Sequence, residues 1–517
     1  MLGAMSGRRR GAVVLSVIAL IAIAACGDAD QGVTATRSDE QATDTAPPDT
    51  GSTDTVPVDT QPLNTDPANP LDPTEDTTPA PTPDQQIIDF GTPKTPKDYD
   101  NFLNAAFLDI TQFWTDNFEP TYGSAFAPVS GIFALYPERE DLPQSCDGPV
   151  NFSDVEGNAF YTSCGDIIVY DDAELLPDLV TNLGAAAVGV VAAHEYGHAI
   201  QQRAGVFDLG LPTVDTEQQA DCFAGAWTAH VARGESDLLS FGDQEVKSGL
   251  IAMIQVADPP GIDVVADPSG HGTAFDRVGA FQDGFINGVT RCSDYPNNPN
   301  PRIDLAFNTQ QEFDTGGNLP YDEILAALPK ALDTFWVPTL SASSVPFTPP
   351  TLLAFTADNV PACDSFAAEQ LVNNATYCTA TNQIAYDDTF VRDLYQRLGD
   401  LSFGYPIAIA YSDAVQVALQ SQLAGEPRAL LNDCLVGAWI DDIIPSGQVD
   451  ADGNQVANNP NQEILLSSGD LDEAVSTAVA LGDEASDTNV VGTAFEKIDS
   501  FRAGVLGGLS ACQARIG

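Results

Sequence analysis

The chain has 517 residues, 43% of them hydrophobic, so it is long enough to bury one or two sizeable cores. It carries 74 Asp and Glu against 20 Lys and Arg, which gives a formal net charge of −54. A surface this acidic repels the phosphates of nucleic acid, so we expect no nucleic-acid partner.

The first 26 residues are typical of an exported lipoprotein. Three arginines, Arg8–Arg10, precede the short apolar stretch Ala12–Ala25, and Cys26 follows directly. A basic segment before a short apolar one is an export signal, and this stretch falls short of the ~20 residues of a membrane-spanning helix. The residues before Cys26 resemble a bacterial lipobox, whose cysteine receives lipid. We therefore expect a signal peptide over 1–26 and a lipid anchor at Cys26, on the outer face of the cell membrane.

Residues 27–93 are rich in Thr, Asp and Pro and contain almost no large apolar residue before Ile87. Such a segment cannot bury enough apolar surface to offset the entropy lost on ordering. Its prolines keep it extended. We expect a disordered stalk between the lipid anchor and the folded part of the chain.

The rest of the chain contains a degenerate internal repeat. The matches occur in one order at similar spacings: YTSCGDIIVYDD from Tyr161 with YCTATNQIAYDD from Tyr377, DCFAGAW from Asp221 with DCLVGAW from Asp433, and GTAFDRVGAFQDG from Gly272 with GTAFEKIDSFRAG from Gly492. A duplication predicts two tandem related domains, roughly 94–300 and 318–517.

The local patterns predict the α+β class, mainly α, with helices and a small sheet in each domain. Asn182–Ala204 is rich in Ala and Val and is followed by Gly205, which indicates one long helix. Thr216–Ala232 indicates a second helix with Thr216 as its N-cap. The apolar run Asp166–Tyr170 predicts a strand, either inside the sheet or at an edge where an extended peptide can pair with it.

The chain has nine cysteines, which divide into Cys26 and eight others that can pair in an oxidising compartment. No Cys-x-x-Cys pair occurs, which argues against a metal cluster. If each half closes its bridges in the same way, the pairs are Cys146–Cys164, Cys222–Cys292, Cys363–Cys378 and Cys434–Cys512.

The first long helix contains the sequence His194-Glu195-Tyr196-Gly197-His198. A spacing of four residues puts both imidazoles on one helix face, where both can bind one metal ion. Glu195 lies near the open side of such an ion, where it can take a proton from bound water. The motif predicts a zinc site with two histidine ligands and Glu195 as the general base.

A tetrahedral catalytic zinc needs a third protein ligand besides water. The second helix offers Glu217 and Asp221, which share one face, and the spacing alone leaves both open. The segments HEYGHAIQ, EQQADCFAGAW and HGTAFDR resemble the neutral zinc metallopeptidase family of bacteria. They are also similar, more distantly, to the CaaX prenyl protease group of gluzincins. The resemblance runs from the end of the stalk to Cys292.

The resemblance implies roles for four residues. Glu217 is implied as the third zinc ligand, and Asp221 as a support for a ligand histidine. His271 and Arg277 have the separation of a His and an Arg in the prenyl proteases, implied to stabilise the oxyanion of the tetrahedral intermediate. The alternatives are Asp221 as the ligand, His271 as an ordinary loop residue and Arg277 as the partner of a carboxylate.

The second half lacks the metal-binding pattern. The stretch corresponding to HEYGH reads Tyr411–Val415, Ala429 stands opposite Glu217, and Val491 stands opposite His271. No histidine follows His271. We expect a degenerate, inactive copy of the first domain and one Zn²⁺ per chain.

The pattern as a whole predicts a zinc metallopeptidase, an endopeptidase that hydrolyses peptide or protein substrates at the cell surface. One alternative is a non-catalytic surface binding or scaffold protein with a structural zinc. Structural sites are usually closed by four protein ligands, whereas the sequence offers three and a base. A second alternative is a peptide-binding adaptor in which the second half is the functional part.

Overall fold

The computed structural model describes residues 86–262, 270–307, 309–364, 366–449, 455–482 and 493–514. The predicted signal peptide, the predicted lipidation site Cys26, most of the predicted stalk and Val491 lie outside these residues. None of the helices in the described part combines the length and apolar character that a bilayer crossing requires.

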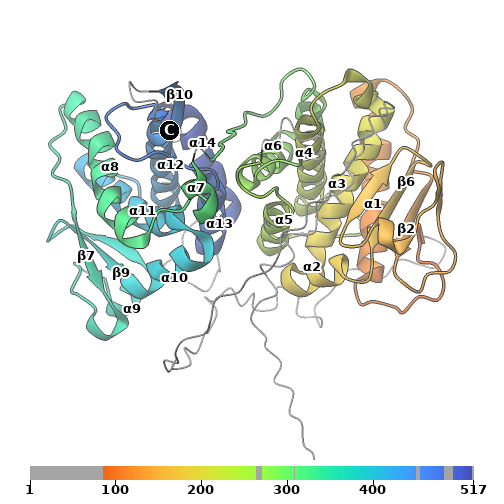
Figure 1. Cartoon of the computed structure of the whole chain (residues 1–517), viewed down its shortest axis with the longest axis horizontal. Helices are drawn as coiled ribbons and strands as arrows, with labels where there is room; N and C mark the ends of the chain where they lie inside the picture. Colours follow the sequence, from red (N-terminus) through yellow and green to blue (C-terminus); the bar gives the residue numbers. More distant parts are fainter. Residues whose placement is uncertain are drawn as a thin grey trace, which may run out of the picture.

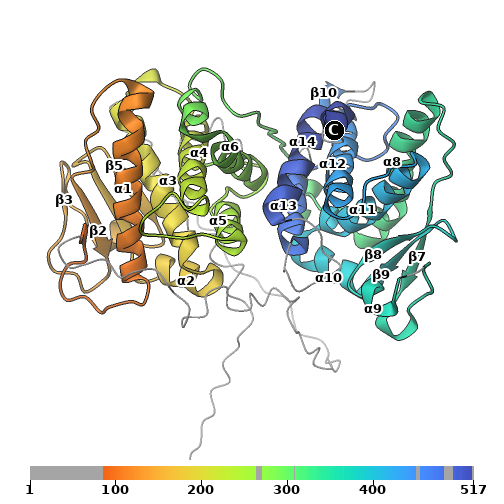
Figure 2. The same ribbon diagram turned by 180° about the vertical axis from the view of Figure 1, so that it is seen from behind.

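The described chain forms two lobes side by side, each built of helices with a small sheet on its outer side (Figures 1 and 2). Helices predominate and the sheets are short, so the predicted α+β, mainly α class is confirmed. The origin of the lobes by duplication stays a prediction.

The sheet of the first lobe has the strand order β1-β2-β6-β5. Its strands are β1 (Ile88–Asp89), β2 (Gly131–Leu135), β6 (Ile167–Asp171) and β5 (Ala159–Thr162), and a separate small hairpin consists of β3 (Gln144–Ser145) and β4 (Gly148–Pro149). β1, β2 and β6 are parallel, and β5 runs antiparallel to β6. The predicted strand Asp166–Tyr170 is therefore an inner strand, shifted by one residue, and the edge strands of the sheet are β1 and β5.

The fold begins before residue 94. β1 pairs with β2 through Ile88 and Asp89, which lie inside the segment predicted as stalk. Ile88 is buried, and its N–H donates to the side chain of Asn104. The boundary at 93 is therefore wrong, because the composition of the stalk hides a short strand whose order comes from pairing with a distant partner.

The described part of the first lobe has six α-helices. They are α1 (Asp100–Tyr122), α2 (Leu175–Leu183), α3 (Ala185–Ala204), α4 (Thr213–Ala232), α5 (Asp243–Gln255) and α6 (Ala274–Ser293). The single helix predicted over Asn182–Ala204 is in fact the end of α2 followed by α3. Gly184 separates them, because its φ of 89° and ψ of 169° are not helical.

Two predicted helix ends have different outcomes. α3 ends where predicted, at Gly205, whose left-handed φ of 73° allows its N–H to bond a carbonyl of the last turn. α4 begins at Thr213, earlier than predicted, after Pro212. The hydroxyl of Thr216 donates to the carbonyl of Thr213 inside the helix, so Thr216 is not the N-cap.

α3 is the central helix of the first lobe, since every residue from Ala185 to Gln201 is buried. It packs against α1, α4 and α5 and contacts β5. A helix buried on all sides carries no single apolar stripe, which is why its sequence is uniformly rich in Ala and Val. This burial places the HEYGH segment inside the lobe.

α4 and α6 cross in backbone contact. A Cβ built on Gly225 would lie 1.9 Å from a carbonyl oxygen of α6, and one on Gly284 would lie 1.8 Å from a carbonyl oxygen of α4. The disulfide Cys222–Cys292 joins the same two helices. This crossing fixes the distance between the side chains that α4 and α6 direct toward the site.

The second lobe repeats this arrangement. Its sheet has the order β7-β9-β8, with the same strand directions as β2-β6-β5. The elements are β7 (Thr351–Phe355), β8 (Ala375–Cys378), β9 (Gln383–Asp387), β10 (Pro445–Val449), β11 (Gln455–Ala457), α7 (Gln310–Thr315), α8 (Tyr321–Ala342), α9 (Ala368–Leu371), α10 (Asp388–Leu398), α11 (Asp400–Ala418), α12 (Glu426–Ile443), α13 (Asp470–Leu481) and α14 (Ala494–Ala514). Close glycines, Gly437 and Gly504, and a disulfide again join the two crossing helices, α12 and α14. The structure contains all four cysteine pairs that the repeat suggests.

The matching ends of α3 and α11 correct the register between the lobes. α3 follows Gly184 and α11 follows Gly399, and both glycines have positive φ. The residue with positive φ after each helix, Gly205 or Gln420, lies equally far along the chain from the glycine before it. The N–H of the following residue, Val206 or Ser421, donates to the carbonyl of Gln201 in α3 or of Gln416 in α11.

In this register, Ile409–Asp413 lie opposite HEYGH, and the predicted Tyr411–Val415 is displaced by two residues. Tyr411 then corresponds to Tyr196, and the tyrosine hydroxyls contact a side chain on α8 and on α1 respectively. Insertions between the short matches hid this register. Ala410 takes the place of Glu195, so the second lobe still lacks the base.

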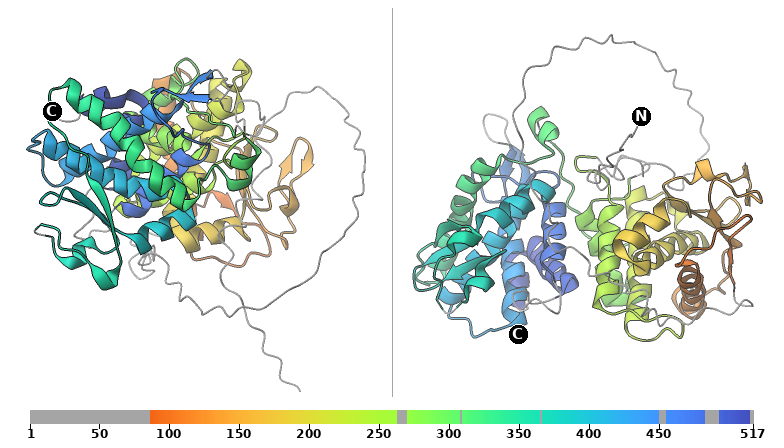
Figure 3. Two further views of the ribbon diagram at one scale, coloured as in Figure 1. Left: turned by 60° about the vertical axis from the view of Figure 1, so that its left-hand side comes forward. Right: turned by 90° about the horizontal axis from the view of Figure 1, so that it is seen from below.

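The lobes meet where α5 and α6 face α13 and α14 (Figure 1, and the right-hand view of Figure 3). The Phe285 and Phe495 rings pack 4.7 Å apart, and the Phe275 and Phe501 rings 6.3 Å apart. The buried Arg502 donates to the carbonyl of Phe275 and lies over its ring. Aromatic rings from both lobes therefore form part of this contact surface.

We predict that Phe501→Ala lowers the free energy of unfolding by about 3–5 kcal/mol, because it leaves a cavity at a fully buried contact between the lobes. Leu506→Ala on the same helix is the control, since Leu506 is 40% exposed, and should change stability by less than about 0.5 kcal/mol. Equal effects of the two variants in denaturant unfolding would contradict the packing described.

Candidate metal centre

The imidazoles of His194 and His198 extend from α3 toward α4, with ring centroids 4.8 Å apart. Glu217 on α4 faces both: its Oε2 lies 3.2 Å from Nε2 of His194, and its Oε1 lies 3.5 Å from Nε2 of His198. All three side chains are buried, and their ligand atoms lie within 4.8 Å of one another. The structure thus brings together the three residues predicted as zinc ligands.

Contacts behind the two imidazoles set their tautomers. Nδ1 of His194 lies 2.7 Å from Oδ1 of Asp221, and Nδ1 of His198 lies 2.8 Å from Oε1 of Gln201. Because both partners are acceptors, each Nδ1 carries the proton in the neutral ring and each Nε2 presents a lone pair. Both Nε2 atoms therefore point toward Glu217 as metal ligands must.

The residues present fit a zinc ion. Two imidazole lone pairs facing carboxylate oxygens at 3.2 and 3.5 Å repel one another unless positive charge lies between them. Oε2 of Glu217 is buried and has no hydrogen-bond donor among the described residues. Two imidazole nitrogens and one carboxylate are a ligand set of catalytic zinc, with a fourth position left for water.

The electrostatics of the cluster also favour a cation. Burial lowers the pKa of His194, but Asp221 and Glu217 outweigh it and raise that pKa to about 10. Burial raises the pKa of Glu217, but His198 and His194 overcome it and hold that pKa well below its usual range. Positive charge is thus stabilised between the three groups, and a metal ion that binds there displaces protons.

Asp221 lies behind His194 and is held by Arg277. The guanidinium donates to both carboxylate oxygens, with Nε–Oδ2 at 3.0 Å and Nη2–Oδ1 at 2.8 Å, and its Nη1 donates to the carbonyl of Val256. Asp221 therefore has the supporting position that the resemblance implies. Arg277 occupies the alternative position, as the partner of a carboxylate, and its action on an oxyanion stays a prediction.

The second lobe keeps a counterpart of this ion pair. Nζ of Lys497 lies 3.2 Å from Oδ2 of Asp433, and the hydroxyl of Tyr405 donates to Oδ1 of the same carboxylate. The Tyr405 hydroxyl thus contacts Asp433 as the imidazole of His194 contacts Asp221. The pair persists where no metal-binding group is present among the described residues around it.

Glu195 lies beside the predicted ligands without joining them. Its Oε2 accepts the backbone N–H of Tyr161 on the edge strand β5, at 3.0 Å. Burial raises the pKa of Glu195. This contact aims the carboxylate along the border between α3 and β5, as expected for a general base.

His271 reaches the same site from the loop before α6. The backbone N–H of His271 donates to Oδ2 of Asp258 at 2.6 Å, and the ring nitrogen Nδ1 lies 3.4 Å from Oδ1 of the same residue. Asp258 precedes two prolines and belongs to no periodic pattern, so no motif in the sequence indicates its role. It orients His271 and leaves Nε2 for another partner.

The site opens into a cleft. His194, Glu195, His198, Glu217, His271 and Arg277 form its polar part, and Leu175, Leu179, Val191, Met253 and Val256 form its apolar part. The backbone of β5 borders the cleft at Ala159 and Phe160. The cleft therefore combines charged groups with an apolar wall.

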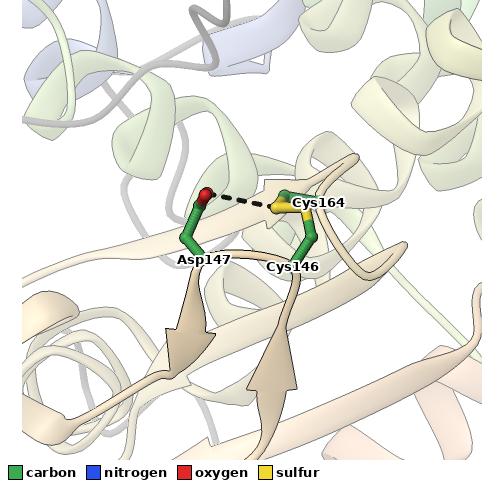
Figure 4. A group of neighbouring side chains, drawn as sticks. All are labelled: Cys146, Asp147 and Cys164. Carbon is green, nitrogen blue, oxygen red and sulfur yellow. Dashed lines mark hydrogen bonds between the residues drawn. A yellow bond between two sulfur atoms is a disulfide. The ribbon is translucent and has the colours of Figure 1, made fainter.

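A second cluster with metal-binding residue types, Cys146, Asp147 and Cys164, is not a metal site. The two sulfurs form a disulfide, and Oδ2 of Asp147 lies 3.1 Å from Sγ of Cys164 (Figure 4). Only a thiolate binds metal strongly, and neither sulfur is available as one.

Two histidines on one helix, a glutamate from a second helix and an adjacent glutamate form a group that could hold a metal ion, and they have the arrangement typical of zinc metallopeptidases. Residues 60–295 match the model of the family described as "Putative neutral zinc metallopeptidase". This part of the chain is similar to that family, which confirms the resemblance seen in the sequence.

Similar proteins include the uncharacterized protein YpfJ of Escherichia coli K12, which is 32% identical over 145 residues. The uncharacterized protein Rv2575 of Mycobacterium tuberculosis is 33% identical over 111 residues. These alignments cover 23% and 18% of this chain, and 48% and 38% of the relatives. The chain thus spans about half or less of their length. No solved structure matches.

We predict that the purified protein binds one zinc ion per chain and that Glu217→Ala abolishes tight binding, because it removes a ligand. Asp221→Asn should weaken zinc binding by about 10–100-fold, since it loosens a ligand imidazole without removing it. Both effects can be measured by competition with a chelating indicator.

Asp433→Asn is the matched control, because Asp433 has the same place in the second lobe. It should leave zinc affinity unchanged. Two tightly bound zinc ions in the unmodified protein, or equal losses in the Asp221 and Asp433 variants, would show that the site is assigned wrongly.

Proposed function

We propose that the protein is a zinc-dependent endopeptidase. The observation that carries the proposal is the convergence of His194, His198 and Glu217 on one point, with Glu195 fixed beside them at the edge strand β5. The match of this half to a metallopeptidase family supports it.

The substrate lies along β5 in this proposal. β5 is an edge strand, and its backbone at Ala159 and Phe160 borders the cleft. An extended peptide that adds to such an edge gains main-chain hydrogen bonds whatever its sequence. This mode suits cleavage within a chain.

A zinc ion held by His194, His198 and Glu217 would polarise the scissile carbonyl and lower the pKa of water. Glu195 then takes a proton from the attacking water and returns it to the leaving amine. His271, oriented by Asp258, donates a hydrogen bond to the oxygen on which negative charge develops.

The apolar wall of the cleft sets a preference. Leu175 and Leu179 from α2 line the cleft together with Met253 and Val256. Burying an apolar side chain there contributes about 1.5–3 kcal/mol. We propose that the enzyme prefers an apolar residue next to the cleaved bond.

The site of action in this proposal is the outer face of the cell membrane. The basic and apolar segments before Cys26 support export and lipid attachment. The four cysteine pairs suit an oxidising compartment. The lipid at Cys26 is the proposed contact with the membrane.

We predict that Glu195→Gln lowers the rate of cleavage of an unfolded protein substrate by at least about 10²-fold, because the amide cannot accept the proton. Zinc content should stay at one per chain, since Glu195 is not a ligand. Glu119→Gln, an exposed helical position, is the control and should keep full activity.

Full activity of the Glu195→Gln variant would overturn the mechanism. A zinc-loaded protein that cleaves no unfolded substrate would favour a surface binding or scaffold protein with a structural zinc.

A further inference from the structure

Three buried carboxylates meet in the second lobe, away from the zinc site. Asp400 is the first residue of α11, and Asp470 and Glu473 lie in the first turn of α13. One oxygen from each lies within 4.8 Å of the others. The residues are 5%, 7% and 8% exposed. α13 is one of the helices that face the first lobe (Figure 1).

The charge of this cluster is not balanced by a side chain. Burial and mutual repulsion raise the pKa of Asp470 and Glu473 well above their usual range, and no basic residue of the described chain opposes this. Like charges this close together repel each other strongly in a site shielded from water. The folded protein therefore needs bound protons or a cation at this point.

Hydrogen bonding in the cluster leaves an oxygen without a donor. Backbone N–H groups bond Oδ2 of Asp400, Oε2 of Glu473 and Oδ2 of Asp470 at 2.7–2.8 Å. Oδ1 of Asp470 is buried, and no donor in the described chain reaches it. A buried acceptor without a partner destabilises the folded state. A cation among the three carboxylates would remove this cost.

We propose that Asp400, Asp470 and Glu473 bind a calcium ion. The donors are all oxygens, which suits a hard cation and not zinc. Mg²⁺ keeps several of its waters, whereas Ca²⁺ accepts several protein oxygens in a flexible geometry, as a buried cluster requires. Ca²⁺ reduces the charge of the cluster from −3 to −1, and the N-termini of α11 and α13 contribute roughly +0.5 each.

The same turn of α13 contacts the loop that carries His271. Oδ1 of Asp472 accepts the N–H of Phe275 at 2.8 Å, in the first turn of α6. Gly469 lies against Pro260, with its Cβ position 3.2 Å from the proline ring. Asp258, just before Pro260, holds His271. Calcium would therefore brace this loop from behind, and this second step rests on the proposed peptidase function.

The test is a calcium titration of the full-length, zinc-saturated protein in excess Mg²⁺ and moderate salt, which suppress weak binding to surface carboxylates. We expect one saturable Ca²⁺ per chain and a rise in Tm of a few degrees. Asp470→Asn and Glu473→Gln should each weaken this binding by more than about tenfold, because each removes a ligand. Asp322→Asn, an exposed acid in the first turn of α8, is the matched control and should bind like the unmodified protein.

The absence of a saturable calcium site in the unmodified protein would overturn the proposal. So would an equal calcium-induced rise in Tm in the unmodified protein and in Asp470→Asn. If protons balance the charge of the cluster, the Asp470→Asn variant should be as stable as the unmodified protein, and calcium should not change its Tm. Binding and Tm do not depend on hydrolysis, so this result is separate from any failure of the peptidase assay.

Discussion

A chain of buried polar contacts, from Arg277 through Asp221 to His194, ties α6, α4 and α3 together at the metal centre. Each group is shielded from water, so each needs the next as its partner. The first lobe thus orients a predicted ligand with the same contacts that hold its helices. The second lobe keeps Lys497 and Asp433 in the corresponding places although the imidazole is gone. The ion pair therefore has a role in packing that is independent of metal.

The sequence predicted those parts of the site that depend on local spacing. Four residues along a helix suffice to place His194 beside His198, and the resemblance supplied Glu217. Gln201 lies in the same helix and could have been found from its spacing of three after His198. Asp258 and the N–H of Tyr161 reach the site from distant segments, and only the tertiary fold brings them there.

The fold class was predictable from the dominance of helical patterns, whereas several boundaries were not. Gly184 interrupts a run that reads as one helix, because its backbone leaves the helical region between two buried helices. β1 is ordered by pairing with β2, although its surroundings have the composition of a linker. Such boundaries depend on contacts between segments far apart in the chain, which composition and periodicity do not report.

The crossing of α4 and α6 has a consequence for how the protein tolerates substitution. Gly225 and Gly284 touch no predicted ligand, yet any side chain there would meet the backbone of the opposite helix. Even the smallest replacement has to push the helices apart and draw Arg277 away from Asp221. If every position were substituted and zinc binding measured, these two glycines should therefore tolerate replacement as poorly as the predicted ligands. Their importance comes entirely from the absence of a side chain.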